Sequence, residues 1–553
     1  MSQITIYAAR KILTMNPRRP TATHLAVRDG RVLGTGNLDD LTGWGAYTLD
    51  DRFADKVLMP GLVEGHSHSW EGSAWEDTYV GFYDRMAPDR VVHAGLKSID
   101  DVVERLRQVE KTLEDPNEPL LAWGFDPIFL GDRRMNVGDL NRVSSTRCIL
   151  VMHQSGHIIN VNSALLDKAG IRGDSNAMGL ARDEHGNPSG ELQGPALRNI
   201  AYRAVGRNRF LDMGRGPSLW RFAHSALLAG VTTATDLANE LPEETVASQV
   251  ATTSDEAFPL RLVPAFVGMS RPADEGVEWV RSLIPRSNER LRYGLVKLVL
   301  DGSIQGFTAR LEWPGYYNGN PNGLWYIDPD ELPRILGTYH QSGLQVHIHT
   351  NGDQASAAAI DAIEQVLKAH PSPDARFTLQ HCQMAHDAHF RRMRKLGICA
   401  NLFANHLYYW GEQHRALTMG PERAERMDAA GTAERLGVSY AIHSDAPVTH
   451  LGPLFTAWCA VNRRTSAGRV LGRSECISVA QALHAITIGA AYTLKLDHEI
   501  GSLETGKRAD VAILDDDPTA VDPAALKDVP IWGTMVGGRV FACEDLGQAP
   551  ESG

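Results

Sequence analysis

The sequence is poor in cysteine and has no long hydrophobic run, and both absences argue against whole classes of protein. Only six of the 553 residues are cysteine, and no two of them form a C-x-x-C pair. A disulfide scaffold is therefore not expected, and a reducing compartment is. No stretch of about 18 apolar residues occurs, and the start of the sequence shows no basic segment followed by an apolar one. We therefore expect a cytoplasmic protein without a membrane partner.

The sequence also lacks blocks of charge of one sign. Its formal net charge is −12, with acidic and basic residues interspersed along the chain. Binding to nucleic acid or to an anionic membrane requires a basic patch, so the charge pattern argues against both partners. A chain of this length with 43% hydrophobic residues can bury a large core and a smaller one. These properties are typical of a large enzyme that acts on a small molecule.

Both ends of the sequence are rich in short strand patterns. Near the start, Leu25–Leu33 carries an Asp-Gly turn between two apolar halves, and near the end Met535–Val540 carries a Gly-Gly turn. Neither end is long enough to form a core of its own. We therefore predict that residues 1–56 and 496–553 combine into one small β-sandwich.

The middle of the sequence alternates apolar runs of strand length with amphipathic runs of helix length, as parallel β/α units do. Two of the helical runs are Gln354–His370 and Ser478–Thr493, and Ser478 is the predicted N-cap of the second. We predict an α/β fold, a TIM-like (β/α)8 barrel formed by residues 57–75 and 221–495. Its eight predicted strands are Val57–Val63, Val231–Asp236, Leu260–Gly268, Leu295–Leu300, Leu344–His349, Phe377–His381, Ile398–Leu402 and Val438–Asp445.

A ninth apolar run, Cys148–His153, does not fit an eight-stranded barrel. The gap that contains it is far too long for an ordinary loop between a strand and a helix. We therefore assign residues 76–220 to a long insertion after the first barrel strand.

The sequence contains an H-x-H pair, His66 and His68, directly after the first predicted strand. Residues two apart on an extended segment face the same way, so both imidazoles can bind one divalent ion. Two unrelated histidines in a loop are the alternative.

Other ligand-type residues fall at the ends of later strands. His349 ends the fifth, His381 the sixth and Asp445 the eighth, and the active sites of such barrels lie at this face. The alternatives are core histidines satisfied by hydrogen bonds and, for Asp445, a helix cap. His347 faces the same side as His349, and we prefer His349 because it lies nearer the strand end.

Lys297 lies within an apolar run that is predicted to be buried on both faces. Lysine is almost never fully buried without a partner, and burial favours its neutral form. A neutral amine can react with carbon dioxide to give a carbamate, whose two oxygens can bridge two metal ions. The alternative is a lysine paired with Asp301.

Six motifs carry a resemblance to a known family. They are Met59–His68 (MPGLVEGHSH), Gly156–Leu165 (GHIINVNSAL), Val296–Ser303 (VKLVLDGS), His349–Ala355 (HTNGDQA), His443–Val448 (HSDAPV) and Ile500–Asp510 (IGSLETGKRAD). The first and last resemble hallmarks of the amidohydrolase superfamily. The others resemble its family 3 branch, which includes enzymes similar to N-substituted formamide deformylases. The resemblance covers nearly the whole chain and is weakly specific for substrate.

The resemblance implies one or two metal ions held by a defined set of residues. Zinc is the expected ion because imidazole suits it, although such ligands also accept other divalent metals. Two departures leave the set open: the family often has glycine where His443 stands, and His347 adds an imidazole near the site. The implied ligands are His66, His68, Lys297, His349, His381 and Asp445.

The implied reaction is hydrolysis of an amide-type C–N bond, such as that of an N-substituted formamide or N-acyl amine, by metal-activated hydroxide. Asp445 is the expected proton carrier, and His157 is the expected donor to the developing oxyanion, with a structural role as its alternative. Cleavage of a carbamate, an ester or a cyclic amide stays open, as does a barrel that has lost its chemistry. The expected assembly is a homodimer.

Aromatic residues cluster near the expected mouth of the barrel. Loops after the strands form the pocket in this fold, so an apolar or aromatic substituent on the substrate is expected. Packing of the insertion onto the barrel is the alternative role for these rings. The expected substrate contacts are Trp70, Trp123, Phe125, Asp301, Trp313 and Tyr408.

Overall fold

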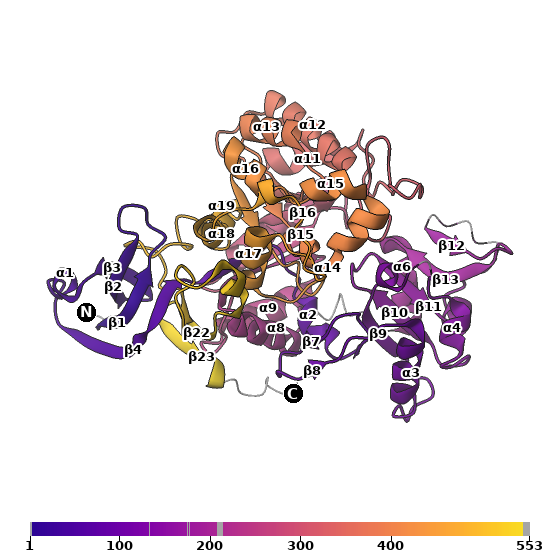
Figure 1. Ribbon diagram of the computed structural model, residues 1–553, viewed down its shortest axis with the longest axis horizontal. Helices are drawn as coiled ribbons and strands as arrows, with labels where there is room; N and C mark the ends of the chain where they lie inside the picture. The colour runs from indigo at the N-terminus through magenta and orange to yellow at the C-terminus, as the bar shows by residue number, and fades with distance from the viewer. Residues whose placement is uncertain are drawn as a thin grey trace.

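The computed structural model describes residues 3–131, 133–173, 175, 177, 179–206 and 214–545. The described strands form an eight-stranded, a seven-stranded, a six-stranded and a two-stranded sheet. In Figure 1 the eight-stranded sheet and its helices occupy the centre and top of the molecule. The sheet that contains both ends of the chain lies to the left, and the insertion lies to the right.

The eight-stranded sheet is parallel throughout and curls back on itself. Past the ends of its two edge strands, Ser67 and Ala446 form a parallel bridge, and the amide of His68 donates to the carbonyl of Ala446 at 2.8 Å. The fold is therefore a TIM-like α/β barrel. Its strands, in spatial order, are β5 (Leu62–Glu64), β14 (Val231–Asn239), β15 (Arg261–Val267), β16 (Leu295–Val299), β17 (Gln345–Thr350), β18 (Thr378–His381), β19 (Cys399–Leu402) and β20 (Tyr440–Ile442).

The prediction that Val57–Val63 is one barrel strand is wrong. Its first half belongs to β4 (Tyr47–Pro60), which pairs with strands from both ends of the chain, and only Leu62–Glu64 enters the barrel. The chain changes sheet at Gly61, where a Cβ atom would lie 2.0 Å from Oγ1 of Thr232. Only glycine permits this approach, so the chain leaves one sheet and enters the other without a loop.

Helices cover the outside of the barrel. Their apolar faces pack on the strands, which are buried on both sides, and together they form the largest core of the protein. The described helices around the barrel are α8 (Gly216–Leu228), α9 (Glu243–Ser254), α10 (Ala273–Leu283), α11 (Leu332–Gln341), α12 (Asp353–Ala369), α13 (Asp387–Leu396), α14 (Asn405–Gln413), α15 (Gly420–Arg426), α16 (Ala430–Leu436) and α17 (Pro453–Asn462).

The last helical run is divided in two. α18 (Val479–Ala485) begins at Ser478 in a capping box with Gln481, as the sequence predicts for its N-terminus. The carbonyl of Ile486 accepts a hydrogen bond from the amide of Val63 in β5 at 2.9 Å. This carbonyl therefore pairs with a barrel strand, and the helix is interrupted here. A second helix, α19 (Ile488–Thr493), follows, so the prediction of one continuous helix is wrong.

The insertion has its own six-stranded sheet. The ninth apolar run forms β10 (Ile149–His153), which pairs with β9 (Leu120–Phe125) and β11 (Ile158–Val161), outside the barrel. The sheet is completed by β6 (Thr78–Tyr79), β12 (Leu180–Arg182) and β13 (Pro188–Gln193). Around it lie α2 (Trp70–Ala74), α3 (Ile99–Glu110), α4 (Val137–Asn141), α5 (Ser163–Lys168), α6 (Pro195–Val205) and the hairpin of β7 (Arg85–Met86) and β8 (Val92–His93).

Strands from the two ends of the chain lie in one seven-stranded sheet. Its order is β23 (Arg539–Ala542), β22 (Ile531–Val536), β21 (Val511–Leu514), β4, β1 (Ile4–Leu13), β2 (Thr21–Arg28) and β3 (Arg31–Gly36), with α1 (Leu38–Thr42) after β3. The two-layer sandwich and the residue bounds of the domains stay predictions.

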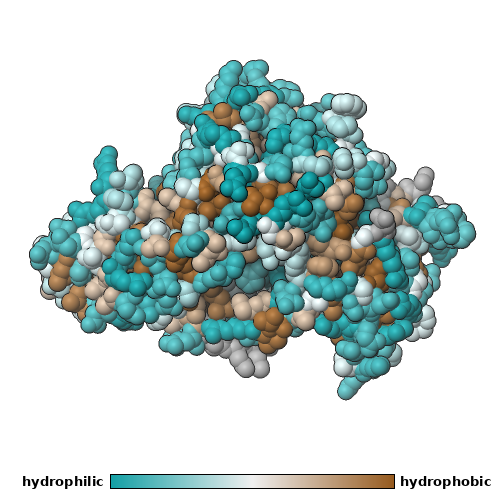
Figure 2. All heavy atoms as spheres, in the orientation of Figure 1, coloured by the Kyte–Doolittle hydropathy of each residue, from teal (hydrophilic) through white to brown (hydrophobic). Residues whose placement is uncertain are grey.

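On the face shown in Figure 2, hydrophobic residues gather in groups that are separated by hydrophilic residues, as on ordinary globular proteins. No helix in the described ranges has both the length and the hydropathy that a membrane span requires.

Candidate active site

A cavity of about 300 Å³ opens at the carboxyl ends of the barrel strands. His66 and His68 follow β5, Lys297 lies in β16, and the other ligand-type residues lie at the ends of β17, β18 and β20. All the residues predicted as metal ligands line this one cavity: His66, His68, Lys297, His349, His381 and Asp445. Strands far apart in the sequence thus bring them together.

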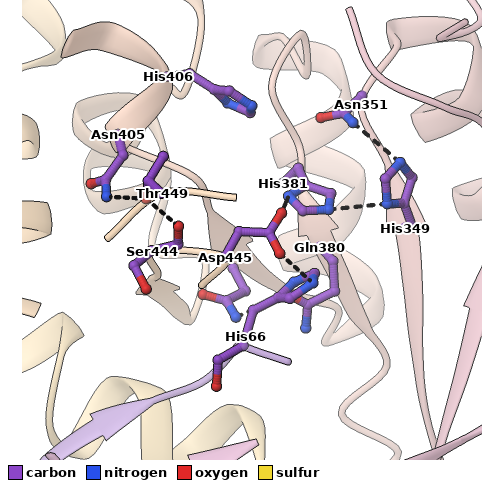
Figure 3. Close-up of polar contacts among 12 residues, drawn as sticks. His66, His349, Asn351, Gln380, His381, Asn405, His406, Ser444, Asp445 and Thr449 are labelled. Atoms are coloured by element: carbon purple, nitrogen blue, oxygen red, sulfur yellow. Dashed lines mark hydrogen bonds and ion pairs between the residues drawn. The ribbon is translucent and has the colours of Figure 1, made fainter. Parts of the chain in front are cut away.

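The Asp445 carboxylate lies at the centre of this group (Figure 3). Its Oδ1 atom is 3.4 Å from Nε2 of His66 and 3.1 Å from Nε2 of His68, and its Oδ2 atom is 3.8 Å from Nδ1 of His381. Asp445 and His381 have φ angles of +54° and +71°, in the left-handed region. Such backbone conformations cost free energy in non-glycine residues and cluster at functional sites.

Neighbouring side chains fix the orientation of His66. Its Nδ1 atom lies 2.7 Å from Oε1 of Gln380, and this contact requires the hydrogen atom on Nδ1. The Nε2 atom therefore keeps its lone pair and faces Asp445, as a metal ligand requires. Gln380 is a positioning residue that the sequence reading missed, although it directly precedes His381 in the chain.

His347 is turned away from the cavity. Its Nδ1 atom lies 2.8 Å from Nε2 of Gln380, and its Nε2 atom lies 2.9 Å from the carbonyl oxygen of Thr493. Both nitrogens are therefore used inside the barrel. His349 lies two residues further along β17 and lines the cavity. Its Nδ1 atom lies 3.0 Å from Nε2 of His381.

Lys297 is buried, with 2% of its surface exposed. Among the described residues its Nζ atom has no hydrogen-bond partner. Burial lowers its pKa to about 7, while the negative charge of Asp445 acts in the opposite direction. The expected alternative, a pair with Asp301, is not formed, because the Asp301 carboxylate instead accepts hydrogen bonds from the amides of Asn351 and Gly352. A lysine amine that loses its proton near neutral pH is suited to carbamate formation.

The residues present fit a divalent metal ion. Within the described ranges, His66, His68 and Asp445 place ligand atoms within 4.8 Å of one another, and so do His66, His381 and His443. The Nδ1 atom of His381 is buried without a hydrogen-bond partner among these residues. Burial lowers the pKa values of the three imidazoles His66, His381 and His443, and neighbouring positive charge adds to the effect. Neutral imidazoles beside a carboxylate are a typical donor set for such an ion.

His443 is part of this cluster, although it is not among the predicted ligands. Its ring stacks on that of His66 with a centroid distance of 4.5 Å. Neither of its nitrogens has a hydrogen-bond partner in the described part of the chain. It directly follows β20, two residues before Asp445. This position at the end of a barrel strand is the feature of the sequence that could have identified it as a ligand.

His157 reaches the cavity from the insertion. It lines the same cavity, and its ring centroid is 5.4 Å from that of His349. Burial lowers its pKa to about 3, so the imidazole is neutral. The insertion therefore supplies one wall of the site.

Of the predicted substrate contacts, Trp70 lines the cavity and the others do not. Trp123 and Phe125 are buried in two cores of the insertion, and Tyr408 packs on Phe455 and Trp458. Trp313 is 95% exposed, and Asp301 is held by backbone amides. The structure therefore does not place these residues in the cavity. Packing uses the side chains of Trp123, Phe125 and Tyr408, backbone amides hold Asp301, and Trp313 lies on the surface.

Residues that sequence reasoning did not single out also line the cavity. They include Arg198 and Tyr326 as polar groups, and Val267, Met269 and Val299 as apolar ones. The three apolar residues end or follow barrel strands. Only this position in the sequence could have indicated that they line the cavity. The lining of the cavity therefore adds both apolar and polar side chains to the cluster of ligand-type residues.

Glu64 ties the first barrel strand to the loop after the last one. Its buried carboxylate accepts hydrogen bonds from the hydroxyl of Ser444 at 2.8 Å, from the amide of Ser444 at 3.2 Å and from the amide of His66 at 3.3 Å. These contacts join the segments that carry His66 and Asp445. Glu64 is therefore a positioning residue.

Replacing Glu64 by alanine is expected to lower the free energy of unfolding by about 3 kcal/mol, because buried donors lose their acceptor. Thermal unfolding followed by circular dichroism measures this as a lower midpoint, and metal affinity should fall as well. Glu114→Ala, at an exposed position, is the control. An unchanged midpoint in Glu64→Ala would contradict the role of the carboxylate as a tie.

Comparison with known proteins decides the family. The model of the amidohydrolase family matches residues 54–542, which is most of the chain. The chain belongs to the amidohydrolase family. It is therefore an amidohydrolase.

Individual relatives of this amidohydrolase are distant. It is 28% identical to the protein LONG AFTER FAR-RED 3 of Arabidopsis thaliana, over 96% of this chain and 90% of the relative. It is 24% identical to the N-substituted formamide deformylase of Arthrobacter pascens, over 95% of this chain and 96% of the relative. The fold matches that of an uncharacterized metal-dependent hydrolase from Pyrococcus horikoshii, with a TM-score of 0.72 and 20% identity over 94% of this chain and 99% of the other.

Proposed function

We propose that this amidohydrolase cleaves an amide-type C–N bond, such as that of an N-substituted formamide or an N-acyl amine, in a small organic substrate. The observation that carries the proposal is the single cavity that gathers four imidazoles from the ends of barrel strands, Lys297 and the Asp445 carboxylate. The similarity to the N-substituted formamide deformylase supports the choice of an amide.

We propose zinc as the metal, one ion or two. The residues that would hold it are His66, His68, Lys297, His349, His381 and Asp445, with Lys297 carbamylated if there are two ions. When bound, such an ion lowers the pKa of a water molecule to about 7 and polarises a carbonyl group. His443 is a further possible donor, since its nitrogens lie in the same cluster.

Asp445 is the proposed proton carrier of the reaction. Its carboxylate accepts the proton of the attacking water and delivers it to the leaving nitrogen, because an amine departs poorly as an anion. The imidazoles of His66, His68 and His381 lie within 3.8 Å of its oxygens, so the carboxylate lies beside the proposed metal ligands, where the attacking water would be bound. The bond that breaks is the C–N bond, and the products are a carboxylic acid and an amine.

His157 is the proposed donor to the carbonyl oxygen as negative charge develops on it. Neutral imidazole carries one N–H, and a donor of this kind stabilises an oxyanion best in a cavity that excludes water. The apolar side chains of the lining, among them Trp70, Met269 and Val299, are proposed to hold an apolar substituent of the substrate. A homodimer and a cytoplasmic location stay predictions.

The proposal is tested with a panel of matched small substrates. Zinc-loaded protein is expected to release formate and the amine from a secondary formamide with an apolar N-substituent. Formate and amine are measured separately, with Asp445→Asn as the inactive control. Turnover of carbamates, esters or cyclic amides while formamides and N-acyl amines stay inert would contradict the proposed substrate class.

A further inference from the structure

A second, much smaller cavity of about 20 Å³ opens beside the main one. It shares lining residues with the main cavity, among them His157, His381 and Asp445. The side chains of Gln305, Asn351 and His406 line only the small cavity. A space of this size holds a single group about as large as a water molecule. Figure 3 shows Asn351 and His406 above Asp445, on the far side of the carboxylate from His66.

Two amide oxygens on this cavity have no donor in the described part of the protein. Oδ1 of Asn351 and Oε1 of Gln305 are buried without a hydrogen-bond partner, and each residue is only 4% exposed. The orientation of Asn351 is fixed, because its Nδ2 atom donates to the carbonyl of Gly302 at 2.9 Å. Two buried acceptors on one small cavity are costly unless a donor occupies it.

His406 adds a third acceptor. Its Nδ1 atom lies 3.4 Å from both carboxylate oxygens of Asp428, which is buried near the positively charged Arg463. Burial raises the pKa of the Asp428 carboxyl well above its ordinary value, and in either charge state this group has an oxygen that accepts. With the hydrogen atom on Nδ1 donated to that oxygen, Nε2 keeps its lone pair. Burial lowers the pKa of His406 to about 3, which keeps the ring neutral. The residue is 2% exposed and lines the small cavity.

We propose that the small cavity is a subsite for a hydrogen-bond donor, and that it binds the N–H group of a primary or secondary amide, which donates to His406 with the amide oxygens of Asn351 and Gln305 lining the same space. This inference rests on the proposed function and narrows it. The subsite lies beside Asp445, where the nitrogen of the cleaved bond must receive its proton. An ester has no N–H and a tertiary amide carries a carbon in its place, so both are selected against.

The kinetic test compares a secondary formamide with the formate ester of the same shape. In His406→Leu, kcat/KM for the amide is expected to fall about tenfold more than kcat/KM for the ester, because only the amide loses a hydrogen bond. His406→Gln, whose side-chain oxygen reaches the place of Nε2, is expected to restore part of the amide preference. His414→Leu is the matched control, a buried histidine with a ring centroid 6.1 Å from that of His406 and outside the lining of both cavities. Equal losses for amide and ester in His406→Leu would overturn the subsite.

A binding test separates this inference from the proposed function. Calorimetry measures the affinity of zinc-loaded protein for a secondary amide and for its N-methylated form. The secondary amide is expected to bind about tenfold more weakly to His406→Leu than to the natural protein, with the N-methylated amide unchanged. This result without turnover of any amide would contradict the proposed function and support the subsite. Amide cleavage without any difference between the two ligands would overturn the subsite alone.

Discussion

Replacing Asp445 by asparagine is expected to lower kcat/KM about 10³-fold, because asparagine can neither take a proton from water nor pass one to the leaving nitrogen. The isosteric change keeps the size of the side chain, and the amide of residue 445 still donates to the carbonyl of His66. The loss should therefore appear in turnover rather than in folding. Steady-state kinetics on the best amide of the panel, with the midpoint of thermal unfolding as a check, measures it.

The control for this variant is Asp353→Asn. Asp353 is also a buried carboxylate near the carboxyl ends of the strands, but it accepts a hydrogen bond from the amide of Glu312 and does not line the cavity. Its replacement is expected to change kcat/KM far less than that of Asp445. An Asp445→Asn variant that retains activity within about tenfold of the natural protein would refute the assignment of Asp445 as the proton carrier.

Removing the metal is expected to abolish activity. A chelator dialysed against the protein should reduce turnover to background, and zinc added back should restore it, because no other group in the cavity can activate water at neutral pH to the same degree. Elemental analysis of the active protein gives the number of ions per chain. Activity that survives with no measurable metal would refute the proposed mechanism.

The metal content of a Lys297 variant tests whether the lysine helps to hold a second ion. If carbamylated Lys297 bridges two ions, Lys297→Met is expected to lower the metal content by at least one ion per chain and to reduce activity with it. Lys368→Met, which removes an exposed amine paired with Glu364, is the control and should retain both. An unchanged metal content in Lys297→Met would show that the lysine is not a ligand.

The course of the barrel strands could be predicted from the sequence. Strands buried on both faces are continuous apolar runs, and this pattern requires no knowledge of their partners. The runs that end in His349 and His381 lie in the parallel sheet at nearly the predicted positions. The ninth run, Cys148–His153, is predicted to lie outside the barrel from the strand count and the length of the gap, and it forms β10 in the sheet of the insertion.

Breaks within elements could not be predicted, because they depend on contacts between distant segments. The chain changes sheet at Gly61 because of the close approach of Thr232, and the last helix is interrupted where the carbonyl of Ile486 meets Val63. Neither contact leaves a local pattern. Propensity and periodicity describe single segments of the chain, whereas these breaks result from the packing of two distant segments against each other.

By itself the sequence determined the ligand-type residues, their order along the chain and their place at the strand ends. Tertiary structure alone decided which nitrogen and oxygen atoms face one another: it turned His347 inward, stacked His443 on His66, and used Trp123 and Tyr408 for packing. The physical reason is that strand order and period fix the face on which a residue lies, while side-chain direction follows from hydrogen bonds and packing with residues distant in the chain.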